Sequence, residues 1–342
     1  MTALRFAVFG TGWWSNYQIP AWFEVGGVEL VALYNRTVSR AEKLAKQYNV
    51  PRVYGDPEEL FRNERLDFVD LIVGNDVHLP MVELAAKYKV PVICQKPMAP
   101  RWDACQKMVQ VCKEAGVPFF IHENLRWQAP VREVKHLLDS GVIGQPYRAR
   151  VQIVGYSALE YADQPFLKEL AQLIMMDMGS HVLDTARYLF GEAQSLYCQH
   201  RRTRQDIRGE DVATVLLNMG EVICSCEMSN ATRTAWGHYP DVNIFIEGAQ
   251  GSIELSPDYW VKVATDDGVT ARRIEAPCYA WMRCDQPHWH ASIVSCHADL
   301  LKAIRAGDQH MAETNADDNL KTMQLIFKAY ESAADNRVMM LD

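Results

Sequence analysis

The sequence lacks the features of a membrane protein or of a nucleic-acid-binding protein. No apolar run among its 342 residues approaches the length of a membrane span, and the amino end shows no signal-peptide pattern. Lysine and arginine number 35 against 43 aspartates and glutamates, which leaves a net charge of −8. Such a surface has no general attraction for nucleic acid or for an anionic membrane. We expect a cytoplasmic protein that acts on a small molecule, with no nucleic-acid or membrane partner.

The sequence also lacks a regular cysteine framework. Its nine cysteines are an odd number with irregular spacing, and Cys224 and Cys226 share one face of a predicted strand with no second pair at zinc-site spacing. Reduced thiols are therefore expected. The stretch His288 to His290, with Cys296 and His297, is the one tempting metal cluster, but its pattern predicts the start of a helix. We expect no metal.

Repeats and low-complexity linkers are absent as well, while 49% of the residues are hydrophobic and 23% are charged. This composition is typical of a globular protein, and the length exceeds what one hydrophobic core usually organises. We predict two closely joined domains, residues 1–124 and residues 125–342.

Strands and helices alternate in the first part, which predicts a doubly wound α/β domain with a parallel sheet covered on both faces. The predicted strands are Leu4 to Phe9, Val28 to Tyr34, Asp67 to Val73, Val90 to Cys94 and Val117 to Ile121. The predicted helices are Trp13 to Glu24, Ser39 to Tyr48, Pro80 to Tyr88 and Arg101 to Ala115.

The second part is rich in strands, which predicts an α+β domain: a large, open, mostly antiparallel sheet with helices on one face. The predicted strands are Tyr147 to Tyr156, Ser195 to Arg201, Val212 to Leu217, Glu221 to Met228, Val242 to Glu247, Ser252 to Leu255 and Trp260 to Val263. The predicted helices are Val131 to Asp139, Ile174 to Phe190, His290 to Ala306 and Ala316 to Ala334, and the last two have room to pack back on the first domain.

A glycine-rich turn, Gly10-Thr11-Gly12-Trp13-Trp14-Ser15, follows the first predicted strand and opens the first helix. Such a turn lets the backbone approach a pyrophosphate, and the helix amino end supplies N–H groups and partial positive charge. The turn predicts a dinucleotide cofactor, NAD or NADP. The second strand ends at Asn35-Arg36, where an acidic residue would commonly bind the ribose of NAD, so a modest preference for NADP is expected.

A second signal is Gln95-Lys96-Pro97, directly after a predicted strand. It resembles the Glu-Lys-Pro motif of the Gfo/Idh/MocA family of oxidoreductases, which includes glucose–fructose oxidoreductase and inositol dehydrogenase. Further segments similar to family motifs are Asn75-Asp76-Val77-His78, Glu123-Asn124-x-Arg126, Gly141 to Pro146, Met176 to Asp184 and Tyr330 to Ala333. The resemblance covers nearly the whole chain and implies a Rossmann domain followed by a sheet domain that binds substrate and builds a dimer or tetramer.

The chain departs from the family pattern at two places. Gln95 stands where the family usually has glutamate, and Asn75-Asp76 replaces the usual Thr-Pro. The first departure removes a carboxylate beside Lys96, and the second puts the shape of a cofactor loop in doubt.

The resemblance implies that Lys96, Asp177 and His181 are catalytic. Asp177 and His181 lie four apart in a predicted helix and therefore share one face. Oxidation of a secondary alcohol needs a base for the hydroxyl proton, and a histidine beside a carboxylate suits that task. We assign His181 as general acid/base, Asp177 as its partner, and Lys96 as the cation that polarises the hydroxyl. An exchange of roles with Lys96 as the base stays open.

The remaining site residues follow from the turn and the resemblance. The expected cofactor contacts are Gly10, Thr11, Gly12, Trp13, Trp14, Asn35, Arg36, Asn75, His78, Gln95, Lys96, Pro97 and Asn124. The expected substrate contacts are Lys96, Arg126, Tyr156, Asp177, His181 and Trp236.

Hydride transfer between NAD(P) and a secondary ring hydroxyl of a sugar, glycoside or cyclitol is the leading hypothesis. Two alternatives stay open. An NAD-dependent glycosidase that oxidises C3 transiently needs the same residues, and a non-catalytic dinucleotide sensor would share the fold.

Overall fold

The computed structural model describes residues 2–156, 164–235, 241–282 and 286–341. The chain forms two compact units. The first consists of Met1–Glu123 and Ile293–Met323, and the second of Asn124–Ser292 and Gln324–Asp342. The long helices α9 (Pro287–Ala306) and α10 (Ala316–Asp335) each contribute residues to both units.

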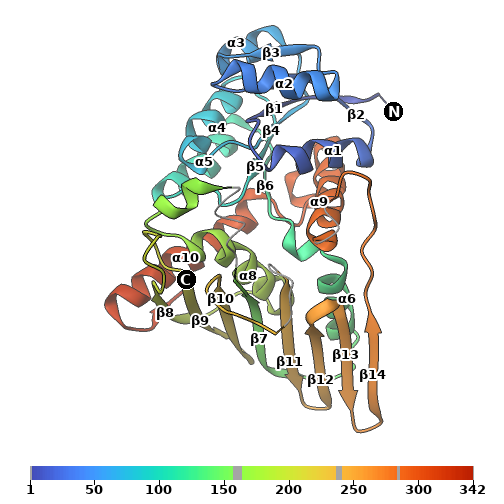
Figure 1. Cartoon of the computed structure of the whole chain (residues 1–342), viewed down its shortest axis with the longest axis vertical. Helices are drawn as coiled ribbons and strands as arrows, with labels where there is room; N and C mark the ends of the chain where they lie inside the picture. Colours follow the sequence, from blue (N-terminus) through green and yellow to red (C-terminus); the bar gives the residue numbers. More distant parts are fainter. Residues whose placement is uncertain (1, 157–163, 236–240, 283–285, 342) are drawn as a thin grey trace. The chain divides into compact units, whose positions relative to one another are not determined.

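The first unit contains a six-stranded parallel sheet in the order β3-β2-β1-β4-β5-β6 (Figure 1). The chain starts in the middle of the sheet and winds outwards in both directions, as the sequence predicts. Its strands are β1 (Leu4–Phe9), β2 (Val28–Tyr34), β3 (Arg52–Tyr54), β4 (Phe68–Leu71), β5 (Val92–Gln95) and β6 (Phe119–His122). Its helices include α1 (Ser15–Val25), α2 (Val38–Tyr48), α3 (Pro57–Asn63), α4 (His78–Lys87) and α5 (Trp102–Ala115).

Successive residues of β1 and β4 are buried, although alternate side chains of a strand point to opposite faces of the sheet. Both faces must therefore be covered. This explains why these strands are continuous apolar runs rather than alternating ones.

Strand β3 and helix α3 are absent from the sequence prediction. The strand has only three residues, which is too short for a periodic pattern. The helix did carry a start signal: the Asp56 side chain accepts hydrogen bonds from the backbone N–H groups of Glu58 and Glu59, and Pro57 occupies the first position.

The second unit contains a nine-stranded sheet in the order β14-β13-β12-β11-β7-β10-β9-β8-β15. Among the strand pairs of the described residues, β7 with β10 is the one parallel pair, so the sheet is mostly antiparallel, as predicted. Its strands are β7 (Pro146–Val154), β8 (Ser195–Arg201), β9 (Val212–Met219), β10 (Val222–Ser229), β11 (Val242–Gly248), β12 (Gly251–Ser256), β13 (Trp260–Thr265), β14 (Gly268–Arg273) and β15 (Met339–Met340).

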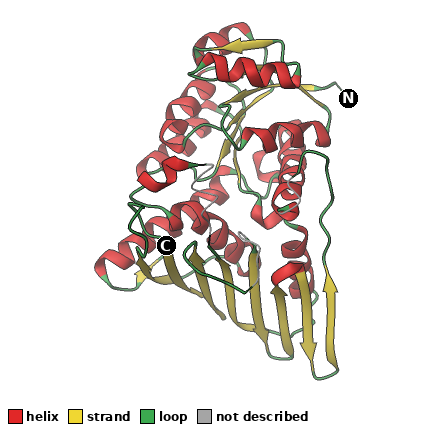
Figure 2. Cartoon of the chain, in the orientation of Figure 1, coloured by secondary structure: helices red, strands yellow, loops and turns green. Residues whose placement is uncertain are grey.

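One face of this sheet carries the helices α6 (Ala129–Asp139) and α8 (Ile174–Phe190) (Figure 2). A row of paired residues crossing the sheet on that face is buried throughout: Leu217, Cys224, Ala149, Ile246, Ile253 and Val263. The neighbouring side chains point to the other face, where Leu216 and Ile223 are 46% and 55% exposed. The second face is therefore open around these two strands.

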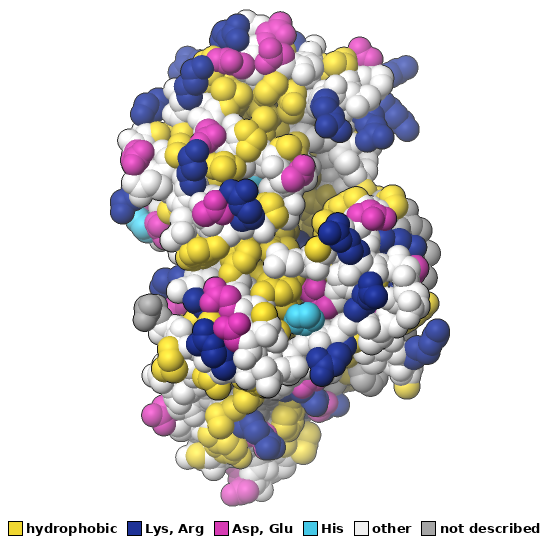
Figure 3. Space-filling model, turned by 90° about the vertical axis from the view of Figure 1, so that its left-hand side faces the viewer, with side chains coloured by type: hydrophobic (Ala, Val, Ile, Leu, Met, Phe, Trp, Pro, Cys, Tyr) yellow, Lys and Arg dark blue, Asp and Glu magenta, His cyan; other side chains and the backbone are white. Residues whose placement is uncertain are grey.

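Two strands of the second unit are missing from the prediction. Every residue of β14 is exposed, so it shows no buried alternation, and β15 has only two residues. No helix among the described residues is long and apolar enough to cross a membrane. On the face drawn in Figure 3, basic and acidic side chains are interspersed rather than gathered by sign.

Candidate functional site

The glycine turn connects β1 to α1 in the first unit. Gly10 has φ of 102°, and a Cβ atom there would lie 2.5 Å from the carbonyl oxygen of Ile72. Only glycine fits this position without a shift of backbone. At Gly12, by contrast, a Cβ would meet no atom within 4 Å. The Ser15 hydroxyl donates to the carbonyl oxygen of Gly12 at 2.6 Å and closes the turn.

Buried polar atoms at this turn fit a dinucleotide. The Thr11 hydroxyl and the Trp14 indole N–H are both buried and have no hydrogen-bond partner within the described part of the chain. Groups of this kind cost free energy unless a ligand or water satisfies them. Together with the open space over Gly12 and the amino end of α1, they suit a pyrophosphate. Trp13 packs against Trp14 and Tyr17, and these ring contacts form a cluster of three aromatic side chains at the turn.

The end of β2 carries the residues expected to contact the adenine ribose. The Asn35 side-chain amide donates to the carbonyl oxygen of Thr37 at 2.9 Å, so it shapes its own turn. Arg36 is exposed, and its charge acts on the nearby Tyr34 phenol, whose pKa burial raises and Arg36 lowers. No carboxylate occupies the two positions at which the ribose hydroxyls of NAD are usually bound.

His78 holds two loops of the first unit together. Its ring nitrogens lie 3.0 Å from the carbonyl oxygen of Met98 and 3.1 Å from that of Val73, and burial lowers its pKa. It thereby ties the segment after β4, which includes Asn75, to the segment after β5. The structure thus gives this predicted cofactor residue a role in shaping the loop.

Lys96 and Pro97 follow β5 directly, both half-buried, and the peptide bond between them is cis. The Gln95 side-chain oxygen accepts a hydrogen bond from the Lys96 backbone N–H at 2.9 Å. Sequence reasoning treated Gln95 as a departure from a motif. The structure shows that it is bonded to the main chain of the predicted catalytic lysine.

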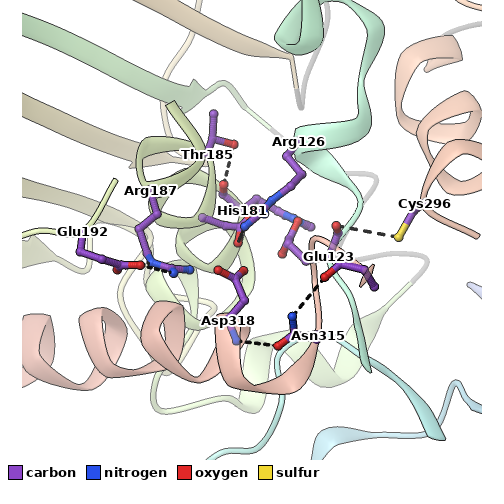
Figure 4. Close-up of polar contacts among 11 residues, drawn as sticks. Glu123, Arg126, His181, Thr185, Arg187, Glu192, Cys296, Asn315 and Asp318 are labelled. Atoms are coloured by element: carbon purple, nitrogen blue, oxygen red, sulfur yellow. Dashed lines mark hydrogen bonds and ion pairs between the residues drawn. The ribbon is translucent and has the colours of Figure 1, made fainter. Parts of the chain in front are cut away.

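In the second unit, helix α8 carries Asp177 in its first turn and His181 one turn later, on the same face. His181 is 2% exposed, and its carbonyl oxygen accepts a hydrogen bond from the Thr185 hydroxyl at 2.8 Å (Figure 4). The Trp289 ring meets the His181 imidazole edge-to-face with ring centroids 5.0 Å apart. The amino end of α8 is held by Glu210, which accepts hydrogen bonds from the backbone N–H groups of Leu173 and Met175.

Glu210 was not found from the sequence. It also accepts from the Tyr330 hydroxyl at 2.6 Å, so the terminal-helix motif that contains Tyr330 serves to anchor α8. Burial and the Glu210 carboxylate raise the pKa of this phenol. A lone glutamate in a loop gives no sequence signal, because its partners lie far away along the chain.

Arg126 forms a buried bidentate ion pair with Asp184, the last residue of the Met176 to Asp184 segment. Its Nε and one terminal nitrogen lie 2.8 and 2.6 Å from the two carboxylate oxygens. The Asn124 side-chain amide donates to the Trp289 carbonyl oxygen and to the Ser292 hydroxyl. These two predicted contact residues are therefore engaged within their own unit.

Tyr156 is 43% exposed, and the guanidinium groups of Arg204 and Arg233 lie 5.8 and 4.4 Å from its ring centre. Trp236 lies outside the described residues. The part of the chain that the structure describes contains no cluster of three or more histidine, cysteine or acidic side chains able to hold a metal ion. The described cysteines are free thiols, and Cys224 and Cys226 lie with their sulfur atoms 4.0 Å apart on the buried face of β10.

Comparison with known proteins assigns both units to one family of oxidoreductases. The model of the oxidoreductase family with an NAD-binding Rossmann fold matches residues 4–123, and that of the GFO/IDH/MocA C-terminal domain matches residues 131–254. The chain is 36% identical to a D-apiose dehydrogenase of Rhizobium rhizogenes, covering 99% of this chain and 98% of that protein. It is 25% identical to an NADP-dependent D-xylose 1-dehydrogenase of Haloarcula marismortui, over 75% of this chain and 73% of that protein.

Among solved structures, the chain resembles an oxidoreductase from Agrobacterium radiobacter in complex with NAD⁺, L-tartaric acid and magnesium. The TM-score is 0.96 at 34% identity, covering 99% of this chain and 98% of the other. These matches span both units and agree with the motifs at the glycine turn, after β5 and on α8. The chain belongs to the Gfo/Idh/MocA family of oxidoreductases with an NAD-binding Rossmann fold.

Proposed function

We propose that the protein is a sugar or cyclitol dehydrogenase that moves a hydride between NAD(P) and a secondary ring hydroxyl. The observation that carries the proposal is the pair Asp177 and His181 on one face of α8, with His181 almost fully buried, in a chain with the family's lysine–proline segment after β5. Relatives named D-apiose, D-xylose and myo-inositol dehydrogenase support a polyol substrate.

In the proposed reaction, His181 removes the proton from the substrate hydroxyl as the carbonyl forms. Asp177 orients the imidazole and stabilises its charged form. The Lys96 ammonium favours alkoxide character on the same oxygen in the transition state. Bound nicotinamide supplies the acceptor for the hydride that leaves the carbinol carbon. In the reverse direction, His181 returns the proton.

The two parts of the chain divide this work. We propose residues 1–124 as the dinucleotide-binding domain and residues 125–342, of which Ile293–Met323 belong to the first compact unit, as the substrate-binding and oligomerisation domain. Tyr156 and Trp236 are proposed substrate contacts, whereas the ion pair with Asp184 favours a supporting role for Arg126. The free cysteines are consistent with the cytoplasm, and the family resemblance supports a homodimer or homotetramer.

For the cofactor, the exposed Arg36 beside the uncharged Asn35 favours NADP modestly. Titration with both cofactors should therefore show tighter binding of NADP, and Arg36→Ala should remove the difference. Arg40→Ala, an exposed arginine on α2, is the matched control. Tighter binding of NAD by the unaltered protein would overturn the preference.

The function is tested with a panel of D-apiose, D-xylose, inositols and aryl glycosides, each incubated with NAD or NADP. Accumulation of reduced cofactor together with a keto product, or a lactone where an anomeric hydroxyl reacts, is the expected result. Release of aglycone without net reduced cofactor would select the glycosidase. If no compound on the panel reacts or binds, the sensor hypothesis replaces the enzyme.

A further inference from the structure

A buried carboxylate lies in the first unit, outside the residues that sequence reasoning selected. Asp70 on β4 is fully buried, and two side-chain donors, the Trp22 indole and the Gln18 amide, make three contacts with its carboxylate oxygens. The Trp22 indole donates to it at 2.8 Å, and the Gln18 amide nitrogen lies 2.8 and 3.0 Å from its two oxygens. Every side-chain partner of this carboxyl group in these bonds is a donor, so the ionised form satisfies all of them.

A series of hydrogen bonds leads from Asp70 to Lys96. The Gln18 side-chain oxygen accepts from the Gln95 amide nitrogen at 2.7 Å, and the Gln95 oxygen accepts from the Lys96 backbone N–H at 2.9 Å. The Gln95 nitrogen also lies 3.4 Å from Nδ1 of His122, which accepts in the tautomer that carries its proton on Nε2. All of these groups belong to the first unit.

The series has a direction, because a carboxamide donates at one end and accepts at the other. An ionised carboxylate only accepts, so Asp70 draws the nitrogen end of Gln18 towards itself. The oxygen end of Gln18 then faces Gln95 and draws its nitrogen end inwards. The oxygen of Gln95 is thereby turned towards Lys96. Reversal of any one amide would set two donors or two acceptors against each other.

We propose that Asp70, acting through Gln18, orients the Gln95 carboxamide so that it holds the main chain at Lys96. Asp70, Gln18 and Gln95 are positioning residues, and the consequence for turnover rests on the proposed function of Lys96. The family motif usually has a carboxylate directly beside the lysine. In this chain the carboxylate is that of Asp70, which is connected to the Lys96 main chain through the hydrogen-bonded side chains of Gln18 and Gln95.

The series predicts a reciprocal pair of variants. Asp70→Asn replaces the carboxylate by an amide. When the oxygen of this amide accepts from the Trp22 indole, its nitrogen faces the side-chain nitrogen of Gln18, and both nitrogens are donors. Gln95→Glu alone sets its carboxylate against the Gln18 oxygen. In the double variant Gln18 reverses, donates to Glu at position 95 and accepts from Asn at position 70. The new carboxylate accepts from the Lys96 N–H, and from His122 once that imidazole carries its proton on Nδ1, so the series is satisfied again.

The test compares kcat at saturating substrate and cofactor at pH 8 for the two single variants and the double variant. We expect each single variant to lose about tenfold, roughly the worth of one net hydrogen bond, and the double variant to return to within about threefold of the unaltered enzyme. Trp22→Phe is the control, because it removes a donor to Asp70 and leaves the amide series intact. It should lower thermal stability with little change in kcat.

A purely structural network would give a different result. Losses in kcat that multiply in the double variant, or a folded Asp70→Asn with unchanged kcat, would overturn the proposal. If Asp70→Asn does not fold, Gln18→Met interrupts the series between its ends, and an unchanged kcat there is equally contrary.

A second readout does not depend on activity. Exchange of the Lys96 amide hydrogen should accelerate in each single variant and slow again in the double variant. Equal protection in all four proteins would contradict the inference, whereas failure of the substrate panel alone would contradict only the proposed function.

Discussion

At the scale of single residues, the site depends on side chains whose partners are distant in sequence. Gln18, Asp70 and Gln95 meet across separations of 52 and 77 residues, and Glu210 reaches Tyr330 across 120. Motifs identified Lys96, because a lysine–proline pair after a strand is visible locally. Its supporting residues leave no local pattern, since hydrogen-bond partners are selected by the fold rather than by spacing.

The roles of Lys96 and His181 can be tested by substitution. Lys96→Met removes the cation and His181→Ala removes the proton acceptor, so each should lower kcat on the order of a hundredfold or more. Cofactor affinity should change little for His181→Ala, because His181 is not among the expected cofactor contacts. His136→Ala, an exposed histidine on α6, is the control for histidine loss. Near-normal turnover of either site variant at saturating substrate would refute the assignment.

Asp70 also makes stability depend on pH. Burial raises its pKa from 3.8 to about 7, while the bonds from Trp22 and Gln18 lower it. Between about pH 4 and pH 7 the folded protein therefore binds a proton that the unfolded chain has released. The free energy of unfolding should fall as pH rises through this window, by an amount on the order of 4 kcal/mol.

The measurement is urea unfolding of the unaltered protein and Asp70→Asn at several pH values from 5 to 8. Asparagine does not titrate, so this part of the slope should vanish in the variant. Cys94 lies near Asp70, but burial and the neighbouring carboxyl group raise its pKa well above its usual value, so it stays a thiol. His297, stacked on Trp22, has its pKa lowered well below the usual value and stays neutral. Parallel curves for the two proteins would exclude the linkage.

At the scale of elements, periodicity predicted the long helices and buried strands because burial imposes a regular pattern on them. Helix α8 begins and ends where its apolar spacing predicts. The pattern failed for β14, whose six residues are all exposed, and for β3, which has three. Such strands exist because a neighbouring strand offers hydrogen bonds, and that information lies in the partner rather than in the segment.

The turn between β1 and α1 gives a prediction about its two glycines. Gly10→Ala should lower thermal stability, because its Cβ would lie 2.5 Å from the Ile72 carbonyl oxygen at a φ of 102°. Gly12→Ala meets no protein atom within 4 Å, so the fold should keep its stability. The added methyl group would instead occupy space proposed for the cofactor and weaken NAD(P) binding at least tenfold.

Thermal unfolding without cofactor and calorimetric titration with cofactor separate the two effects. Gly116→Ala, a substitution at another positive-φ glycine with open space around it, measures the cost of backbone strain alone. If Gly12→Ala bound the cofactor normally, the pyrophosphate would have to lie elsewhere.

At the scale of the whole molecule, the nine-stranded sheet has one covered face and one open face, and the open face carries exposed apolar side chains. Ile223 and Leu216 lie on adjacent strands and are 55% and 46% exposed. Apolar groups at the centre of a sheet are typical of a surface that another subunit covers. The family resemblance, which implies a dimer or tetramer built on this sheet, agrees with the proposed homo-oligomer.

Ile223→Lys should therefore shift the protein towards a smaller species, because a buried ammonium at a subunit contact is costly to desolvate. Light scattering after size-exclusion chromatography, over a range of protein concentrations, measures the change. Phe23→Lys is the control, since Phe23 is also an exposed apolar residue, at 45% against 55% for Ile223, but belongs to the first unit. Circular dichroism should show that both variants remain folded. A variant at Ile223 with the mass of the unaltered protein at every concentration would remove the open face from the proposed interface.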